Sequence, residues 1–238
     1  MKKIKLIAMD LDGTLTQHKT PLDQAHTQTL LKLKEKYKLL MVGAGMCHRI
    51  FKQMNEFPID ILGNYGMQYA KYNDSTKDID IIFNEVRTCD KESVEARVTA
   101  LREKYRFTEF AGNNVEYHTS GCVTFPILGT TAKQEDKLAF DPDRIKRRAI
   151  YDDVKQTFSE YTVFVGGSSS FDMAPYPFNK AYALSKYCEE NGIKHDEVIY
   201  IGDDYGPGGN DESVYLSDFG YLKIDDYRDF SEIVKNLL

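Results

Sequence analysis

Carboxylates follow two apolar runs in this sequence. In LIAMDLDGTLT, residues 6–16, the apolar run stops at Asp10 and a second acid follows at Asp12. Asp203 and Asp204 follow the run VIYIG in the same way. Carboxylates held together without a counter-ion repel one another, which raises their pKa values. A hard divalent cation relieves that repulsion, and a ligand set made of oxygen atoms favours Mg²⁺.

These acids can meet only if the two apolar runs form neighbouring strands. IKLIAM and KLLMV are typical of buried strands, and DILG is a third predicted strand. DQAHTQTLLKLKEKY carries apolar residues at helical spacing, and HRIFKQMNEF is a second predicted helix. Strands that alternate with helices through short loops predict a parallel sheet covered by helices. In such sheets, ligands gather beyond the carboxyl ends of the strands, where these acids stand.

The pattern changes in the middle of the chain. Tyr- and Thr-rich stretches such as FTEF, CVTFPIL, TVFVG and SFDMAP mix there with the helical patterns ESVEARVTALREKY and DRIKRRAIYDDVKQTF, which predicts an antiparallel α+β unit. The alternation then resumes with a helix over 180–191 and the strand EVIYIG. We therefore predict an α/β fold in which a Rossmann-like parallel-sheet core domain, residues 1–66 and 179–238, is interrupted by an inserted α+β domain, residues 67–178.

Composition excludes several kinds of partner. Hydrophobic residues make up 42% and charged residues 29% of the 238 residues, as in an ordinary globular protein. The net charge of −6 argues against nucleic acid or an anionic membrane as a partner. No apolar run approaches the ~20 residues of a membrane helix. The four cysteines lie far apart without metal-type spacing, so we expect unreactive thiols and a reducing cytoplasm.

The motifs resemble those of a known family. DLDGTLT, residues 10–16, resembles the nucleophile motif DxDGT of the haloacid dehalogenase (HAD) superfamily, and GDDYGPGGND resembles its acidic metal loop. Lys180 in FNKAYAL matches the lysine that follows that family's insert. The resemblance covers the whole chain, because the insert lies where the Cof-like branch places an α+β cap domain. Within that branch, PGGND and GGSSSFDMAP are most similar to eukaryotic-type phosphomannomutases.

The resemblance implies a role for each matched residue. Asp10 becomes an aspartyl phosphate, Asp12 serves as general acid and base, and Lys180 neutralises Asp10 and the phosphoryl oxygens. The implied cofactor is Mg²⁺, bound by Asp10, by the backbone carbonyl of Asp12 and by Asp203. Two further residues hold the shell of that metal: Asn210 and Asp211. The implied substrate contacts are Lys19, Gly43, Ala44, Gly45, Lys137, Ser170 and Asp172.

The chain departs from the family after the second strand. The family places there a Ser or Thr that bonds a phosphoryl oxygen, whereas VGAGM has Ala44 and Gly45. The missing charge-assisted hydrogen bond is worth roughly 1.5–3 kcal/mol. Backbone N–H groups from Gly43 to Gly45 can still bind an anion. We expect a hydroxyl restored at position 44 or 45 to improve turnover.

The cap departs as well. His118, Leu128 or Gly129, and Lys137 stand where the family's phosphate-gripping arginines are expected, and Lys19 also replaces an arginine. A lysine keeps the charge but loses the bidentate fork of a guanidinium. The sequence SFD, which contacts the sugar in the family, is retained. The sugar contacts are therefore expected to persist while the grip on a second phosphate is weakened.

Three functions follow from these observations. The first is an Mg²⁺-dependent phosphatase that hydrolyses a small phosphorylated metabolite, above all a sugar phosphate, through an aspartyl phosphate. The second is a phosphomannomutase-like mutase, which needs a firm grip on the second phosphate of a bisphosphate intermediate. The third is a catalytically weak relative that binds a phosphorylated ligand. The family resemblance is compatible with a monomer or with a homodimer formed through the cap.

Overall fold

A computed structural model describes residues 3–238, which divide into two compact units. The first unit comprises residues 3–85, 179–206 and 211–238, and the second comprises residues 86–178 and 207–210. The following paragraphs describe each unit by itself.

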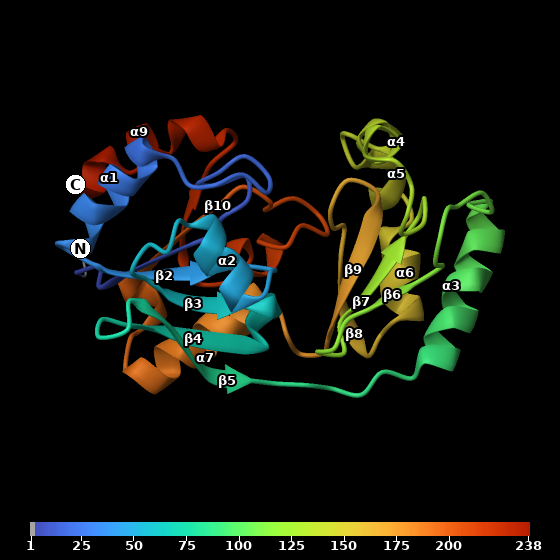
Figure 1. Cartoon of the computed structure of the whole chain (residues 1–238), viewed down its shortest axis with the longest axis horizontal. Helices are drawn as coiled ribbons and strands as arrows, with labels where there is room; N and C mark the ends of the chain where they lie inside the picture. Colours follow the sequence, from blue (N-terminus) through green and yellow to red (C-terminus); the bar gives the residue numbers. More distant parts are fainter. Residues whose placement is uncertain (1–2) are drawn as a thin grey trace. The chain divides into compact units, whose positions relative to one another are not determined.

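A seven-stranded sheet forms the first unit, in the order β11–β10–β1–β2–β3–β4–β5 (Figure 1). Its strands are β1 (Leu6–Met9), β2 (Lys38–Val42), β3 (Asp60–Gly63), β4 (Gln68–Asn73), β5 (Asp78–Asn84), β10 (Val198–Gly202) and β11 (Gly220–Lys223). The strands from β11 to β3 are parallel, which confirms the predicted parallel-sheet core. Strands β1 and β10 are neighbours, so the acids that follow them share one edge of the sheet.

Helices cover both faces of this sheet. Alternate residues of β1 point to opposite faces: Ile7 and Met9 join the apolar cluster of α1, α2 and α9, whereas Leu6 and Ala8 join that of α7 and α8. These helices are α1 (Gln24–Lys34), α2 (Cys47–Gln53), α7 (Lys180–Asn191), α8 (Glu212–Tyr215) and α9 (Phe230–Ile233). Because β1 is buried on both sides, it is apolar throughout, and the first position where a carboxylate can stand is its carboxyl end.

Strands β4 and β5 correct the predicted domain boundary at residue 67. They pair antiparallel with β3 and with each other, and they extend the sheet of the first unit. Ala70 and Ile79 belong to its apolar core. The alternating residues of QYAKYN predict a strand, but alternation does not say which sheet a strand joins. The second unit therefore begins at Val86.

The second unit has a four-stranded antiparallel sheet in the order β6–β7–β9–β8, as predicted for an α+β unit. Its strands are β6 (Glu116–Tyr117), β7 (Val123–Pro126), β8 (Tyr161–Phe164) and β9 (Ser170–Pro175). Its helices are α3 (Lys91–Tyr105), α4 (Gln134–Phe140), α5 (Ile145–Arg148) and α6 (Tyr151–Thr157). Phe125 and Phe171 pack in one apolar cluster with α3 and α6, so that face of the sheet is covered.

Several local features differ from the predicted elements. The helical pattern DRIKRRAIYDDVKQTF divides into α5 and α6, because Ile150 has non-helical backbone angles (φ −114°, ψ 3°). FTEF lies outside any strand. Short 3₁₀ helices complete the chain: η1 (Asn64–Gly66), η2 (His195–Glu197), η3 (Tyr227–Asp229) and η4 (Lys235–Leu237). None of the four cysteines forms a disulfide. Within residues 3–238, every helix is too short or too polar to cross a bilayer.

Candidate active site

The turn after β1 brings Asp10 close to the loop that follows β10. The Asp10 N–H donates to the carbonyl of Ile201 (3.0 Å), and the Thr14 hydroxyl donates to Oδ1 of Asp203 (2.9 Å). Gly13 has φ +94°, and a Cβ there would lie 2.3 Å from Oδ2 of Asp203. Only glycine therefore allows this turn and this loop to approach so closely.

Three carboxylates converge at this edge. Each of Asp10, Asp203 and Asp211 offers an oxygen atom, and these atoms lie within 4.8 Å of one another. Asp10 and Asp211 are buried, and Asp203 is half-buried. The convergence follows from the strand order, because parallel neighbours end at the same edge.

Lys180 bridges two of these acids from the first residue of α7. Its Nζ lies 2.9 Å from Oδ1 of Asp10 and 2.8 Å from Oδ1 of Asp211, and its side chain is 0% exposed. The Asn179 side chain caps α7 by accepting the N–H of Tyr182, which fixes the position where the helix, and with it Lys180, begins.

Asp211 is held from several sides. The Tyr200 hydroxyl donates to the same Oδ1 that Lys180 contacts, and the Asp204 N–H donates to Oδ2 (3.1 Å). Its oxygens are already engaged, so Asp211 is suited to hold its neighbours in place rather than to react.

The buried acids carry more negative charge than Lys180 neutralises. Burial raises the pKa of Asp10 well above its usual range, although Lys180 opposes the change. Burial and the neighbouring Asp211 raise the pKa of Asp203 to about 6. Burial alone would lower the pKa of Lys180, but Asp10 and Asp211 raise it above the usual value, so the lysine stays protonated. An all-oxygen set with excess negative charge fits a hard divalent cation.

Asp12 points its carboxylate at a different group of donors. Oδ1 accepts the Lys19 N–H (2.7 Å) and Nε2 of Gln53 (2.6 Å), and Oδ2 lies 3.5 Å from Nη1 of Arg49. The carboxylate of Asp12 is not in the three-acid cluster, so a metal contact of Asp12 would fall to its backbone carbonyl. Lys19 contributes its backbone, while its side chain is exposed.

The turn after β2 lies against a residue that sequence reasoning missed, Arg49 of α2. The Gly43 N–H donates to the carbonyl of Leu62 (2.9 Å), so anion binding by this turn would fall to Ala44 and Gly45. A Cβ on Gly45 would lie 2.1 Å from Nη2 of Arg49. The sequence signal that could have indicated Arg49 is its spacing, four residues after Gly45, which stands where the family has a Ser or Thr side chain.

The second unit holds Ser170 and Asp172 on β9. Phe171 and Met173 face the cluster of α3 and α6, so Ser170 and Asp172 point to the other face of the sheet. The Thr124 hydroxyl donates to Oδ1 of Asp172 (2.9 Å), and Nε2 of His118 lies 3.1 Å from that hydroxyl. Thr124 was not predicted, although its register opposite Asp172 on the neighbouring strand accounts for the contact.

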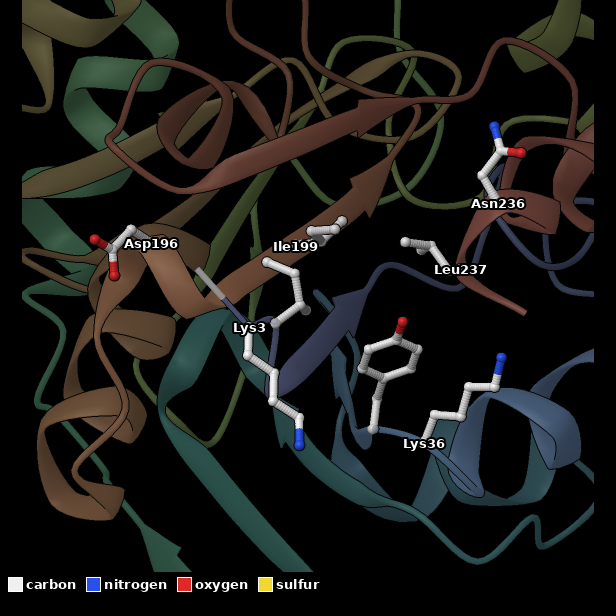
Figure 2. A pocket seen from close by; sticks show the side chains of 8 residues that line it. Lys3, Lys36, Asp196, Ile199, Asn236 and Leu237 are labelled. Carbon is white, nitrogen blue, oxygen red and sulfur yellow. The ribbon is translucent and has the colours of Figure 1, made fainter. Parts of the chain in front are cut away.

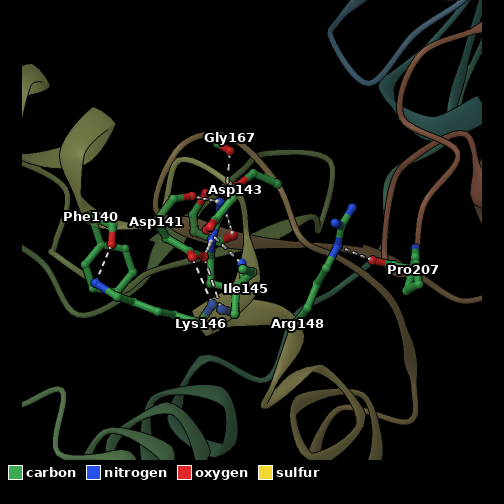
Figure 3. Close-up of polar contacts among 11 residues, drawn as sticks. Phe140, Asp141, Asp143, Ile145, Lys146, Arg148, Gly167 and Pro207 are labelled. Carbon is green, nitrogen blue, oxygen red and sulfur yellow. Dashed lines mark hydrogen bonds and ion pairs between the residues drawn. The ribbon is translucent and has the colours of Figure 1, made fainter. Parts of the chain in front are cut away.

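A buried arginine fixes the loop before Ser170. Arg147 pairs through Nε with Oδ2 of Asp141 (2.8 Å), and its Nη1 donates to the carbonyls of Gly166 (2.6 Å) and Ser170 (3.0 Å). Figure 3 shows this network around Asp141 and Gly167. The arginine therefore satisfies loop carbonyls that would otherwise lack partners.

Two other predicted residues also lie in the second unit. Nζ of Lys137 donates to the carbonyl of Thr130 (3.1 Å), and Asn210 belongs to the short segment 207–210. The first unit therefore assembles Asp10, Asp12, Lys180, Asp203 and Asp211, and the second unit separately carries Lys137, Ser170, Asp172 and Asn210.

A cavity of about 790 Å³ lies elsewhere in the first unit (Figure 2). It is lined by Asn236 and Leu237 of η4, by Ile199 near the start of β10, and by residues that precede β1, β2 and β10, among them Lys3, Tyr37 and Asp196. These residues lie toward the amino ends of the parallel strands, whereas the acids follow their carboxyl ends. The cavity is therefore separate from the acidic site.

Comparison with known sequences identifies relatives of this chain. A sequence model of the haloacid dehalogenase-like hydrolase family matches residues 7–211. The phosphomannomutase of Saccharomyces cerevisiae is 23% identical over 224 residues, which cover 90% of this chain and 85% of that protein. The phosphomannomutase of Solanum lycopersicum is 27% identical over 243 residues, which cover 91% of this chain and 87% of that protein.

Solved structures share the fold. A phosphatase of the haloalkanoate enzyme superfamily from Bacteroides thetaiotaomicron has a TM-score of 0.65 at 17% identity, with 99% of this chain and 95% of that chain covered. An IMP-nucleotidase from Plasmodium falciparum has a TM-score of 0.67 at 14% identity, with 99% and 68% covered. At these identities the likeness concerns the fold alone.

Proposed function

This chain belongs to the haloacid dehalogenase-like hydrolase family, and from that premise we propose that it is an Mg²⁺-dependent phosphatase of a small phosphorylated metabolite. The observation that carries the proposal is the position of Lys180 between Asp10 and Asp211, with the Asp203 carboxylate beside them. A buried lysine beside a carboxylate at a strand end opposes the rise in pKa that burial causes, and so favours the ionised form of a nucleophile that attacks phosphorus.

In the first step, an oxygen of Asp10 attacks phosphorus. The new O–P bond forms as the bond from phosphorus to the leaving oxygen breaks, and Asp12 gives its proton to that oxygen. Lys180 holds the Asp10 carboxylate in place and stabilises the negative charge of the transferring group. The Asp12 carboxylate has partners of its own and lies outside the cluster of Asp10, Asp203 and Asp211. This arrangement fits a role for Asp12 as general acid and a role for Asp10 as nucleophile.

In the second step, water attacks phosphorus of the aspartyl phosphate. Asp12, now a carboxylate, accepts a proton from that water, and Asp10 leaves as the free carboxylate. Inorganic phosphate is released, and the protonation states return to those of the starting enzyme.

Mg²⁺ would be held by Asp10, by the backbone carbonyl of Asp12 and by Asp203, with Asp211 as a support. When bound, the cation neutralises phosphoryl and carboxylate oxygens that would otherwise repel each other. The raised pKa of Asp203 supports this assignment, because a buried carboxylate without a cation holds its proton more tightly.

A sugar phosphate is the proposed substrate class. The support is the similarity to phosphomannomutases over most of their length, together with the retained Ser170 and Asp172. Arg147 fixes the loop before Ser170, and Thr124 holds Asp172, so both groups are preorganised for hydroxyl partners.

A mutase is the second candidate, and the same similarity to phosphomannomutases favours it. A mutase must keep a bisphosphate bound while it reorients. The second unit offers His118 and Lys137 where arginines are expected, and Lys137 already donates to the carbonyl of Thr130. This weaker set of cations favours transfer of the phosphoryl group to water over its transfer back to a bound sugar phosphate.

A panel of sugar phosphates with Mg²⁺ tests the proposal, with free phosphate and isomerised sugar phosphate measured in the same samples. We expect phosphate release that Asp10→Asn reduces by at least about a thousandfold without loss of fold. Asp74→Asn is the matched control, because that side chain is 89% exposed and far along the chain from the acids. Isomerisation that exceeds phosphate release would favour the mutase, and turnover that survives Asp10→Asn would refute the mechanism.

A further inference from the structure

Arg49 places a cation beside the reacting acids. It lies on α2, which follows the turn after β2, and β2 is the neighbour of β1. Its Nη1 donates to Oε1 of Gln53 (2.7 Å) and lies 3.5 Å from Oδ2 of Asp12. Gln53 in turn donates to Oδ1 of Asp12. The guanidinium is therefore held at the acidic edge by two neighbours, yet its side chain is 44% exposed.

Gly45 makes room for this guanidinium. A Cβ at position 45 would lie 2.1 Å from Nη2, 2.4 Å from Nε and 2.5 Å from the guanidinium carbon of Arg49. The planar group thus occupies the space that any side chain at position 45 would fill. A side chain at position 45 would therefore displace the guanidinium of Arg49 from the position that it occupies here.

We propose that Arg49 binds the phosphoryl oxygens of the substrate with the donors of its Nη2–Nε edge, which lies over Gly45. This inference rests on the proposed function, because it names the group that recognises the phosphate in that reaction. The contacts described above use Nη1, which leaves the edge over Gly45 directed at the turn where a phosphate would lie. A guanidinium edge presents two parallel N–H donors, which match two oxygens of a phosphate.

The charge balance of the site supports the same assignment. Lys180 is fully buried and lies beside two carboxylates, Asp10 and Asp211, so its single positive charge cannot also balance the charge of an arriving dianion. The surrounding carboxylates repel a phosphate. An exposed cation at this edge lowers that repulsion, and a bidentate contact would favour phosphate monoesters, which carry terminal oxygens, over diesters, which have fewer.

The test compares Arg49→Met and Arg49→Lys with the wild-type chain. We expect Arg49→Met to lower kcat/KM for the best sugar phosphate by about ten- to a hundredfold. Inorganic phosphate and orthovanadate, measured by calorimetry on the same proteins, should bind more weakly by a similar factor. Arg49→Lys should fall between the two, because it keeps the charge and loses the fork. Lys52→Met is the matched control on the same helix, where the side chain is 75% exposed and pairs with Glu56.

Position 45 supplies a second, independent test. Gly45→Ala should reduce activity in the wild-type background, because its methyl group meets the guanidinium. The same change should be nearly neutral when Arg49 is alanine, and Gly45→Ser in that background should recover part of the lost activity. On this proposal, Gly45→Ser in the wild-type chain should lower activity, and Ala44→Thr is the better test of a restored hydroxyl.

Each result has a distinct meaning. The proposal is overturned if Arg49→Met leaves phosphate and orthovanadate binding within about twofold of wild type. It is also overturned if only kcat falls, since the guanidinium would then act through Asp12 alone. If the wild-type chain shows no Asp10-dependent turnover, the proposed function fails, while the binding comparison still decides whether Arg49 recognises phosphate.

Discussion

Replacement of Lys180 by methionine tests the centre of the site. The side chain is 0% exposed and contacts Asp10 and Asp211 at 2.9 and 2.8 Å, so its loss leaves two carboxylates without their cation. Removal of one partner from a buried ion pair costs about 3–5 kcal/mol of the free energy of unfolding. For a chain of this size, that cost lowers Tm by about 6–20 °C. Turnover should be lost as well, because the same lysine stabilises the transferring phosphoryl group.

The two acids should not suffer equally. Asp211 keeps the Tyr200 hydroxyl and the Asp204 N–H, whereas Asp10 loses its cation. We therefore expect Asp10→Asn to restore about 1–2 kcal/mol in the Lys180→Met background. The same change should not restore turnover, because the nucleophile is then absent.

Chemical unfolding with EDTA present measures these energies. The chain has 16 tyrosines and no tryptophan, so tyrosine fluorescence and far-UV circular dichroism are the natural signals. Lys52→Met is the control for removal of an exposed lysine, and its expected cost is below about 1 kcal/mol. A Lys180→Met protein that unfolds within about 1 kcal/mol of wild type would show that Asp10 and Asp211 do not depend on this cation.

Three further predictions use other parts of the structure. The pKa of Asp203 is raised to about 6, so the folded chain without metal binds a proton more tightly than the unfolded chain, and its free energy of unfolding should fall as pH rises from about 4 to about 6. The gain in Tm from saturating Mg²⁺ should therefore be larger near pH ~7 than near pH ~5. Asp203→Asn should remove that difference. Gly13→Ala should abolish the Mg²⁺-dependent gain in Tm, whereas Gly192→Ala, with φ +63° and no heavy atom within 4 Å, should show backbone strain of about 1 kcal/mol and normal activity. Arg147→Met should destabilise the second unit by about 3–5 kcal/mol, seen as faster hydrogen exchange, and equal exchange would contradict a structural role for its pair with Asp141.

The strand ends of the first unit were predictable, and the reason is physical. A buried strand cannot carry a charge until it leaves the core, so the first acids after two apolar runs mark the same edge of the sheet. Neither apolar run indicates by itself that the strand order is β10–β1–β2. The alternation of strands and helices, however, restricts which strands can be neighbours in the sheet. Asp10 and Asp203 could therefore be placed together from the sequence pattern, whereas Lys180 was assigned to the site only by the family resemblance.

Arg49 and the hairpin of β4 and β5 were harder to predict. An arginine on a short helix is usually solvated, and the position of this one over Gly45 depends on a glycine in the preceding turn and on contacts with Asp12 and Gln53. The hairpin alternates like the strands of the second unit, and its partner is fixed by the pairing of Leu62 with Tyr69 rather than by its own composition. Contacts that depend on a turn or on the choice of sheet carry little local signal.

The segment 207–210 sets a limit on domain exchange. This segment lies outside the insert in sequence but belongs to the second unit. The Gly208 carbonyl accepts a hydrogen bond from the Val165 N–H (2.8 Å). The Pro207 carbonyl accepts one from Nε of Arg148 (3.1 Å), as Figure 3 shows. A chimaera that exchanges only residues 86–178 with a relative replaces the donors of both hydrogen bonds but keeps the two carbonyls that accept them. An exchange of the whole second unit between members of this family would thus need two segments, residues 86–178 and 207–210. The sequences of the insert and of this loop should accordingly vary together among natural relatives.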